Sequence, residues 1–197
     1  MAKLGKRAIR IPEGVRISLE GNVVKMEGPE GNLNLSVPPH LSVLMEKERL
    51  RVNFAPETQQ LTAKVRRKME ALRGLFRSLL NSRISSVKTA CMKKLELVGV
   101  GYQAEVKGED LVLKVGFSHP VILPIPGGIK VKVEKSIISL SGYDPNVVGD
   151  FAARARAVRP PEPYGGKGIR YQGEYVRHKV GKAAGAVGAA PGGVAAK

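Results

Sequence analysis

The side chains best suited to binding phosphate lie in the C-terminal part of the chain. Its two informative stretches are residues 164–171, YGGKGIRY, and residues 177–182, RHKVGK. Glycine lets backbone amides approach a phosphate closely, and lysine and arginine neutralise its charge, arginine through two donors at once. Tyrosine rings can stack on unpaired bases. This pattern of residue types is typical of a segment that binds RNA.

Residues 154–182 hold eight basic residues and two acidic ones, and we expect this stretch to contact RNA. The alternative is a solvated loop whose tyrosines pack on the neighbouring domain, although so high a charge density is hard to place there. The candidate contacts are Arg154, Arg156, Arg159, Tyr164, Lys167, Gly168, Arg170, Tyr171, Arg177, His178, Lys179 and Lys182.

Two further groups of cations are weaker candidates for RNA contacts. The first group lies close to the N-terminus, and the second lies on or just beyond a predicted helix. The basic face of that helix stands opposite an apolar stripe, and such a face is as often simply solvated, so both interpretations stay open. The two groups are Lys3, Lys6 and Arg7, and Arg73, Arg77 and Arg83.

The excess of positive charge is confined to three segments. The net charge is +16, and residues 1–16, 58–88 and 154–182 carry +4, +7 and +6 of it, whereas the stretches between them are close to neutral. Such a distribution favours nucleic acid as the partner over a membrane surface or a merely soluble basic protein. No apolar run reaches the roughly 20 residues of a membrane span. The N-terminus lacks the apolar region of a signal peptide, and the single cysteine, Cys91, fits a reducing cytosol.

Other patterns that carry chemistry fail on their context. Residues 95–104 contain the G-x-G-x-x-A spacing of a dinucleotide-binding turn, but residues 105–110 predict a turn and another strand where that fingerprint needs a helix. The three histidines match no metal-ligand spacing. We therefore expect no enzyme activity, no cofactor and no metal site. A nucleotide-dependent enzyme remains as an alternative that binding of NAD or NADP would support.

Period-two alternation of apolar and polar residues predicts strands in both near-neutral stretches. In the first stretch the expected strands are 15–19, 23–26, 33–37 and 50–54, with a hairpin turn at Gly21. In the second stretch they are 95–98, 102–106, 111–115, 121–123, 129–133 and 137–140. Residues 129–133 alternate apolar residues with lysine, as in a sheet with one solvated face.

A helix is expected after each set of strands. Thr58 is a suitable N-cap, and an apolar stripe at spacings of three and four predicts a helix over about 58–81. The stripe consists of Leu61, Val65, Met69, Leu72, Phe76 and Leu79. A shorter helix is expected after Asp144 and Pro145, through Phe151 and Ala155. The proline-rich residues 159–163 then end regular structure.

The repeated order of strands followed by a helix predicts an α+β fold of two similar small domains, each a mostly antiparallel sheet packed with a helix. The expected boundaries are 1–82 for the first domain, 83–158 for the second, 159–182 for a basic C-terminal arm and 183–197 for a disordered Gly/Ala-rich tail. Residues 11–16 resemble residues 125–130, but this match opens the first set of strands and closes the second, so the topological repeat is the stronger indication.

Four stretches resemble a known family, the bacterial-type large-subunit ribosomal protein six. They keep the order of that family and together span nearly the whole chain except the tail. They are GKRAI with IPEGV within 5–15, KKLELVGVGY at 93–102, GFSHPV at 116–121, and PEPY with GKGIRY within 161–171. Two departures stand out. Gly165 occupies a position where the family usually has lysine. Residues 89–92 replace the Gly-Phe-containing segment that more usually leads into the central strand.

The resemblance implies a structural component of the large ribosomal subunit that binds ribosomal RNA near the stalk base and the sarcin–ricin region, where translation factors dock. The partners that it implies are large-subunit ribosomal RNA, neighbouring ribosomal proteins near the stalk base and, transiently, translation factors. We expect neither a membrane partner nor a homo-oligomer. The expected location is the cytoplasmic ribosome. The resemblance carries principal RNA contacts onto Tyr164, Lys167, Arg170, Tyr171, Arg177, Lys179 and Lys182.

The composition of the arm adds an expectation of its own. A Gly/Pro-rich, cationic segment is expected to become ordered only when its phosphates are present. The alternative to a ribosomal role is a general nucleic-acid-binding architectural protein, which would bind arbitrary duplexes as tightly as ribosomal RNA.

Overall fold

The computed structural model describes Gly5 and residues 7–46, 49–55 and 63–181 of the 197-residue chain. In the first domain the elements are β1 (Ile9–Arg10), β2 (Arg16–Glu20), β3 (Val23–Glu27), β4 (Asn32–Ser36), β5 (Leu41–Glu46), β6 (Arg49–Phe54) and α1 (Ala63–Lys88). In the second they are β7 (Cys91–Val98), β8 (Gln103–Lys107), β9 (Asp110–Lys114), β10 (Val121–Pro124), β11 (Ile129–Glu134), β12 (Ile137–Gly142), α2 (Pro145–Val158) and β13 (Gly168–Tyr171).

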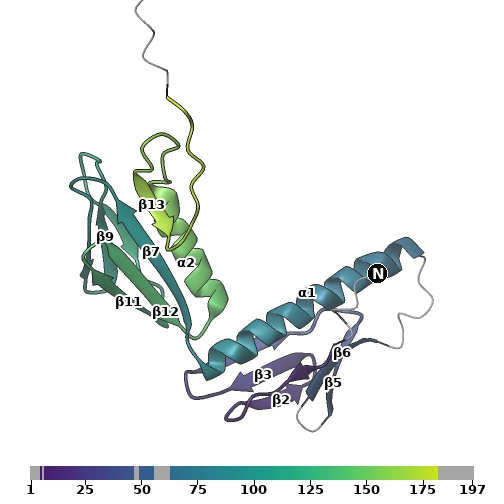
Figure 1. The fold of residues 1–197 in the computed structure, drawn as a ribbon. Coiled ribbons are helices and arrows are strands. Elements are labelled where there is room, and N and C mark those ends of the chain that lie inside the picture. The colour runs from purple at the N-terminus through teal and green to yellow at the C-terminus, as the bar shows by residue number, and fades with distance from the viewer. Residues whose placement is uncertain (1–4, 6, 47–48, 56–62, 182–197) are drawn as a thin grey trace, which may run out of the picture.

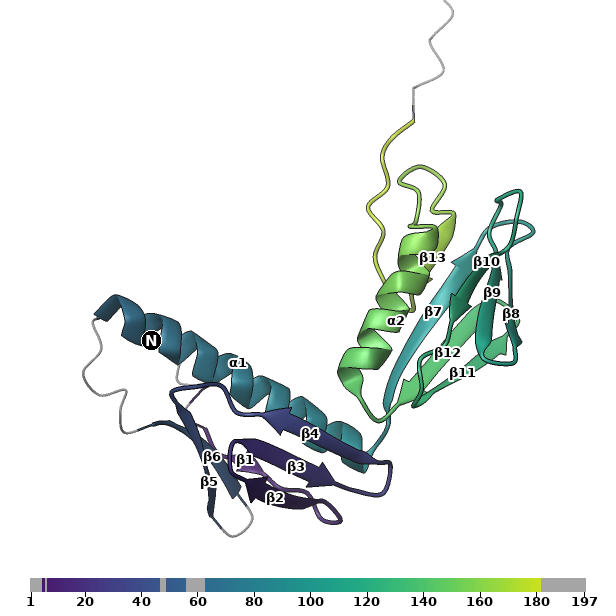
Figure 2. The same ribbon diagram turned by 180° about the vertical axis from the view of Figure 1, so that it is seen from behind.

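The two domains repeat one pattern of strand pairing. The first has sheets in the orders β1-β6-β5 and β2-β3-β4, and the second has β7-β12-β11 and β8-β9-β10, all antiparallel, with β13 added beyond β7. A helix follows the sixth strand of each set, and the two domains meet at the C-terminal end of α1 (Figures 1 and 2). The predicted α+β fold of two similar domains is confirmed.

Equivalent turns support the same alignment of the two domains. The β4–β5 turn has a hydrogen bond from Leu41 N to Pro38 O of 3.3 Å, and the β10–β11 turn has one from Ile129 N to Pro126 O of 3.4 Å. His40 has a φ of 70° and Gly128 one of 86° at the matching position. The β1–β2 turn, within residues 11–16, has a bond of the same kind but stands elsewhere in the repeat. The residue match with 125–130 therefore relates similar turns at non-equivalent places.

Each domain has its own apolar core. The first core gathers residues of α1 and the sheets around it, including Val24, Met26, Leu50 and Leu80, all at 0% exposure. The second places Phe151, Ala152 and Ala155 of α2 against β7, β12 and β13, in one cluster with Leu111 and Leu113 of β9. Asp144 caps α2 by accepting a 2.9 Å hydrogen bond from Asn146 N, and Pro145 occupies the first turn of the helix.

Helix α1 ends later than the sequence predicts. The expected end at residue 81 was wrong, because Ile84 and Val87 extend the buried stripe for two more turns. The buried side chain near the predicted end is Leu80 rather than Leu79. Residues 82–88 are thus helix, and Glu30 N donates a 3.2 Å hydrogen bond to Val87 O at its C-terminal end. The expected N-cap, Thr58, and Leu61 lie outside the described residues.

Most predicted strands are confirmed, including the β2–β3 hairpin, where Gly21 has a φ of 55°. Three strands were missed. β1 has only two residues, and β5 lacks a clean alternation because Leu44 and Met45 are both 49% exposed. The third, β13, is the one that matters for the site.

Candidate nucleic-acid interface

Strand β13 attaches the first half of the C-terminal arm to the second domain. Ile169 is fully buried in the second core, and its N donates a 2.8 Å hydrogen bond to Arg159 O. Tyr171 also packs against that core, so the alternative of a packed tyrosine fits the geometry of this residue. Residues 168–171 are therefore part of a sheet, whereas the sequence placed them in an arm that would become ordered only on RNA.

Gly168 makes this attachment possible. Its φ is +147°, and a Cβ at this position would stand 2.7 Å from both Pro160 O and Pro161 Cα. Only glycine allows the chain to pass so close to the proline segment in this conformation. The sequence indicated a close approach of Gly168 to phosphate, and the structure gives it a close approach to backbone.

A short closed loop precedes β13 and presents two candidate residues. Glu162 N donates to Lys167 O at 2.9 Å, and Gly166 N donates to Glu162 O at 3.0 Å. Gly166 adopts a φ of 67°, which this turn requires. The loop holds Tyr164 at 58% exposure and Lys167 exposed on its surface. Both side chains are therefore available to a large ligand.

The chain beyond β13 returns alongside this loop. Lys179 N donates a 2.8 Å hydrogen bond to Pro163 O, so two stretches that are separated in the sequence motif lie side by side. Arg177, His178 and Lys179 are exposed. Among the described residues, none of Lys167, Arg177 and Lys179 forms an ion pair with a carboxylate. These three cations form, with Tyr164, what we call the arm surface.

Glu174 fastens the arm to α2. Its carboxylate accepts hydrogen bonds from Arg156 Nε at 3.1 Å and Nη2 at 2.5 Å, and from Tyr171 N at 2.9 Å. The hydrogen bonds from Arg156 hold the pKa of Glu174 below its usual value, and the bond from Tyr171 N and the charge of Arg156 act in the same direction. The pair also raises the pKa of Arg156 above its usual value. In this geometry Arg156 of α2 holds the arm in place through its hydrogen bonds to Glu174.

Replacement of Glu174 with glutamine is expected to lower the free energy of unfolding by about 1–2 kcal/mol at pH 7, because the bonds to a charged acceptor are lost. Since the folded pKa of Glu174 lies below its unfolded value, the contribution is present above the ordinary glutamate pKa and is lost as the pH falls through the lowered one. The free energy of unfolding is therefore measured in urea at pH 7 and below about pH 4. The values of the variant and the parent should differ at pH 7 and become equal in acid. The control is Glu162→Gln, at a carboxylate that is exposed and unpaired within the described chain. It should leave the free energy of unfolding unchanged at both pH values.

Two aromatic residues outside the predicted set of contacts lie in this region. Tyr175 is 88% exposed, directly after the Glu174 anchor. Phe117, 42% exposed on the β9–β10 connection, has the guanidinium of Arg159 at 5.4 Å from its ring centroid. Tyr175 could have been noted from its place between Glu174 and Arg177. Nothing local to Phe117 indicates that Arg159 lies beside it.

Two other predicted contacts, Arg154 and Arg170, have carboxylate partners. Arg170 forms an ion pair with Glu96 across β13 and β7 at 3.0 Å, and exposed Arg154 forms one with Asp150 at 3.1 Å. A partially exposed pair of this kind can still meet RNA on its outer side. Arg154, Arg156 and Arg170 therefore stay predictions as RNA contacts, as does Lys182, which lies outside the described residues.

The candidate cations of the first domain are largely occupied within it. Arg73 is 8% exposed, with its guanidinium 4.5 Å from the ring centroid of Phe54. Arg77 Nε donates to Arg7 O, and Arg83 Nη1 donates to Asn34 O, both at 2.8 Å. RNA contacts by these residues remain predictions, but each has a packing or hydrogen-bonding role in the first domain. Lys3 and Lys6 lie outside the described residues.

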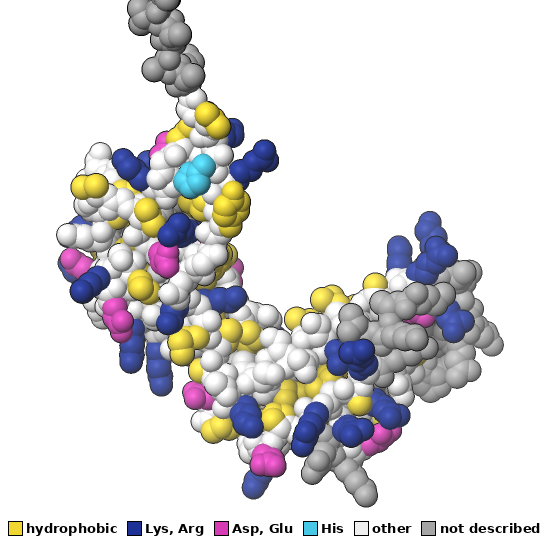
Figure 3. All heavy atoms as spheres, in the orientation of Figure 1, with side chains coloured by type: hydrophobic (Ala, Val, Ile, Leu, Met, Phe, Trp, Pro, Cys, Tyr) yellow, Lys and Arg dark blue, Asp and Glu magenta, His cyan; other side chains and the backbone are white. Residues whose placement is uncertain are grey.

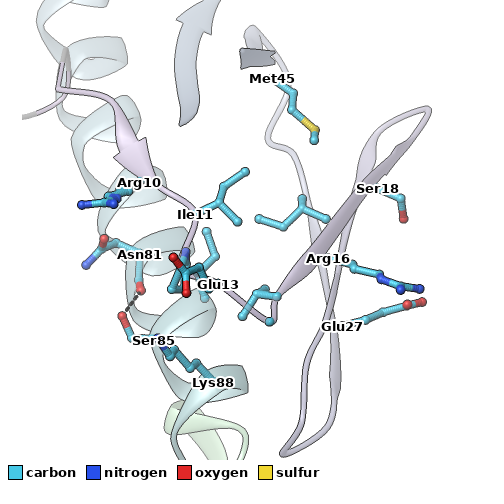
Figure 4. Close-up of a pocket in the computed structure, with 15 residues that line it drawn as sticks. Arg10, Ile11, Glu13, Arg16, Ser18, Glu27, Met45, Asn81, Ser85 and Lys88 are labelled. Atoms are coloured by element: carbon cyan, nitrogen blue, oxygen red, sulfur yellow. Dashed lines mark hydrogen bonds between the residues drawn. The ribbon is translucent and has the colours of Figure 1, made fainter. Parts of the chain in front are cut away.

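A groove of about 1190 Å³ opens in the first domain between the β1–β2 turn, β2 and the C-terminal half of α1 (Figure 4). Cations and carboxylates mix along it: Arg10, Arg16 and Lys88 share it with Glu13 and Glu27. Side chains of opposite charge do not together produce the concentrated positive potential that attracts phosphate. The groove is therefore not a candidate for RNA.

The dinucleotide-like spacing at residues 99–104 spans the turn between β7 and β8 and the first residues of β8, so a strand stands where a dinucleotide site needs a helix, as predicted. Across the described ranges, no three His, Cys, Asp or Glu side chains gather in a way that could hold a metal ion. No helix in the part of the chain that the structure describes is long and apolar enough to cross a membrane.

Fold and surface together define a two-domain α+β protein with a cationic, aromatic C-terminal end. A family model described as ribosomal protein L6 matches residues 11–90 and 98–172 of the chain. The large ribosomal subunit protein uL6 of Synechococcus sp. (strain JA-3-3Ab) is 45% identical over 183 residues, which cover 92% of this chain and 97% of that protein. The uL6 protein of Protochlamydia amoebophila is 44% identical over 185 residues, which cover 93% and 98%. The uL6c protein of Spinacia oleracea is 46% identical over 186 residues, which cover 92% and 80%.

Matches of this extent make the chain a ribosomal protein. It belongs to the ribosomal protein L6 family, as its sequence motifs indicate.

Proposed function

We propose that this chain is a structural, non-catalytic component of the large ribosomal subunit that binds ribosomal RNA mainly through the arm surface. Its relatives carry the name of large ribosomal subunit proteins. The observation that carries the proposal is the set of exposed cations of the arm surface, which have no carboxylate partner in the described chain and stand beside exposed rings. Cations of this kind bind phosphates, and exposed tyrosines stack on unpaired bases.

The place of the protein on the subunit is part of the proposal. The family resemblance of the sequence motifs favours the stalk base and the sarcin–ricin region, where translation factors dock, with ribosomal proteins of the stalk base as neighbours. A photo-crosslinking residue at Tyr164, which is 58% exposed, would be incorporated into ribosomes in cells. Crosslinks to RNA of the sarcin–ricin region are expected, and crosslinks confined to distant RNA would contradict this location.

Sedimentation tests the function itself. A lysate run on a sucrose gradient at physiological salt should show the chain at stoichiometric level with the large subunit, and RNase should release it. A chain that stays at the top of the gradient would contradict the ribosomal role. Binding of arbitrary duplexes as tightly as ribosomal RNA would instead favour a general nucleic-acid-binding protein.

Gly165 offers a gain-of-function test. The residue is exposed, and a Cβ there would meet nothing closer than Glu162 Oε2 at 3.7 Å, so a side chain fits. Gly165→Lys is expected to add one phosphate contact, raising RNA affinity by roughly 5–8-fold near 0.1 M salt and steepening the dependence of log K on log salt by about 0.9. Filter binding over a salt series measures both, and Gly165→Gln, which adds bulk without charge, should leave them unchanged.

A further inference from the structure

A second cluster of unpaired cations lies at the far end of α1. Lys64, Arg66, Arg67 and Lys68 are all exposed, and none forms an ion pair within the described part of the chain. Figure 3 shows Lys and Arg side chains gathered at this end of the first domain, away from the second domain. We call these four residues the α1 basic end.

The arrangement of these cations is unfavourable for the isolated protein. Lys64, Arg67 and Lys68 are spaced three and four residues apart, so they share one helical face and repel one another. The first turn of α1 has no acidic residue, although the positive end of the helix dipole favours acids there. Both effects are relieved when an anion binds across the face.

Several surface cations outside α1 have a carboxylate partner. Lys25 pairs with Glu20, Lys107 and Lys114 both pair with Glu105, and Arg51 pairs with Glu46. These surface cations have a carboxylate nearby, whereas α1 carries only Glu70 among its acids. What sets the α1 basic end apart is that four cations stand within five residues of a helix whose one acidic residue is Glu70.

Distance separates this cluster from the arm surface. Helix α1 has 26 residues, so it is about 39 Å long, and its other end meets the second domain (Figure 1). The screening length at physiological salt is only about 8 Å, so the two clusters act on different phosphates. One RNA segment on the arm surface does not neutralise the α1 basic end.

We propose that the α1 basic end is a second RNA-binding surface, and that the chain bridges two separate RNA segments. The ligand is the phosphate backbone of a duplex or loop, bound without base readout because no exposed aromatic side chain accompanies these cations among the described residues of α1. The inference rests on the proposed RNA-binding function and adds to it a second site and the bridging of RNA.

The test uses the full chain and a fluorescent RNA duplex of about 20 base pairs, a length that leaves room for several phosphate contacts. Binding stoichiometry at low salt is measured by sedimentation velocity for the parent and three variants. K64Q/R67Q/K68Q removes the three cations of the α1 basic end that share one helical face, and K167Q/R177Q/K179Q removes the three cations of the arm surface. K25Q/K107Q/K114Q removes the same charge from paired lysines. All substituted residues are exposed or lie on the surface, and circular dichroism checks that each variant folds.

The parent is expected to bind two duplexes per chain, and the α1 variant one, with the affinity of the tighter site unchanged. The control should still bind two. Two duplexes bound equally well by the α1 variant, or a second duplex lost equally in the control, would overturn the proposal. An unchanged arm variant would instead contradict the proposed function of the arm surface, so the two failures are distinguishable.

Discussion

Replacement of Lys167, Arg177 and Lys179 with glutamine is expected to lower the affinity for large-subunit ribosomal RNA by roughly 100–500-fold near 0.1 M salt. All three side chains are exposed and lack carboxylate partners in the described structure. Each cation that neutralises a phosphate releases bound counterions, which contributes close to one decade of affinity at this salt concentration. Three such contacts give the expected loss.

The salt dependence separates lost contacts from a lost fold. The slope of log K against log salt should become shallower by about 2–3, whereas a misfolded variant would lose binding at every salt concentration. K25Q/K107Q/K114Q lowers the net charge equally at lysines paired with Glu20 and Glu105, and should weaken binding only a few-fold. Equal losses in the two variants would mean that net charge, and not the arm surface, governs binding.

Replacement of Gly168 with alanine is expected to lower the free energy of unfolding by about 3 kcal/mol or more. At a φ of +147° an L-residue is strained, and the added Cβ would stand 2.7 Å from Pro160 O. The nearest atoms belong to backbone, so no flexible side chain can move away to relieve the clash. Strand β13 must then shift from β7 and carry buried Ile169 out of the core.

The same change should weaken RNA binding, although Gly168 itself has no charge. Displacing β13 moves the loop that holds Lys167 and the returning chain that holds Lys179, so the arm surface loses its arrangement. Urea unfolding and RNA binding measured on one preparation should fall together. Gly165→Ala, three residues earlier and with no atom nearer than 3.7 Å to the new Cβ, is the matched control and should change neither. A fully stable Gly168→Ala protein would contradict the role given to this close approach.

The fold class and much of the secondary structure follow from the sequence alone. Alternation over residues 129–133 and the apolar residues that follow Pro145 depend on neighbours in the chain, and the structure has both β11 and α2 where these patterns indicate. The repeated order of strands and helix predicts two similar domains for the same reason. The family motifs identify the chain without any structure, because a motif is a pattern of residues along the sequence.

Tertiary structure decided which of the candidate residues are free to act. A count of charges does not distinguish Arg73, which is buried against Phe54, from exposed cations of the same helix such as Arg67. Periodicity places a side chain on one face of a helix, but only packing shows whether a neighbouring element covers that face. Arg77 and Arg83 are held by carbonyl oxygens of residues 70 and 49 positions away, which no local pattern can indicate.

Strand β13 shows the same limit for the arm. Residues 168–171 have the composition of a phosphate-binding loop, but their sheet partner is β7, in which Glu96 stands 74 positions before Arg170. The pairing of these two residues arises from that non-local register. The position of Arg159 beside Phe117 is a second contact between residues that are distant in the chain. The sequence therefore determined the family, the domain pattern and the cationic character of the C-terminal end. Tertiary structure decided which cations are occupied by internal partners and which remain exposed, because strand pairing and packing join residues that are distant in the chain.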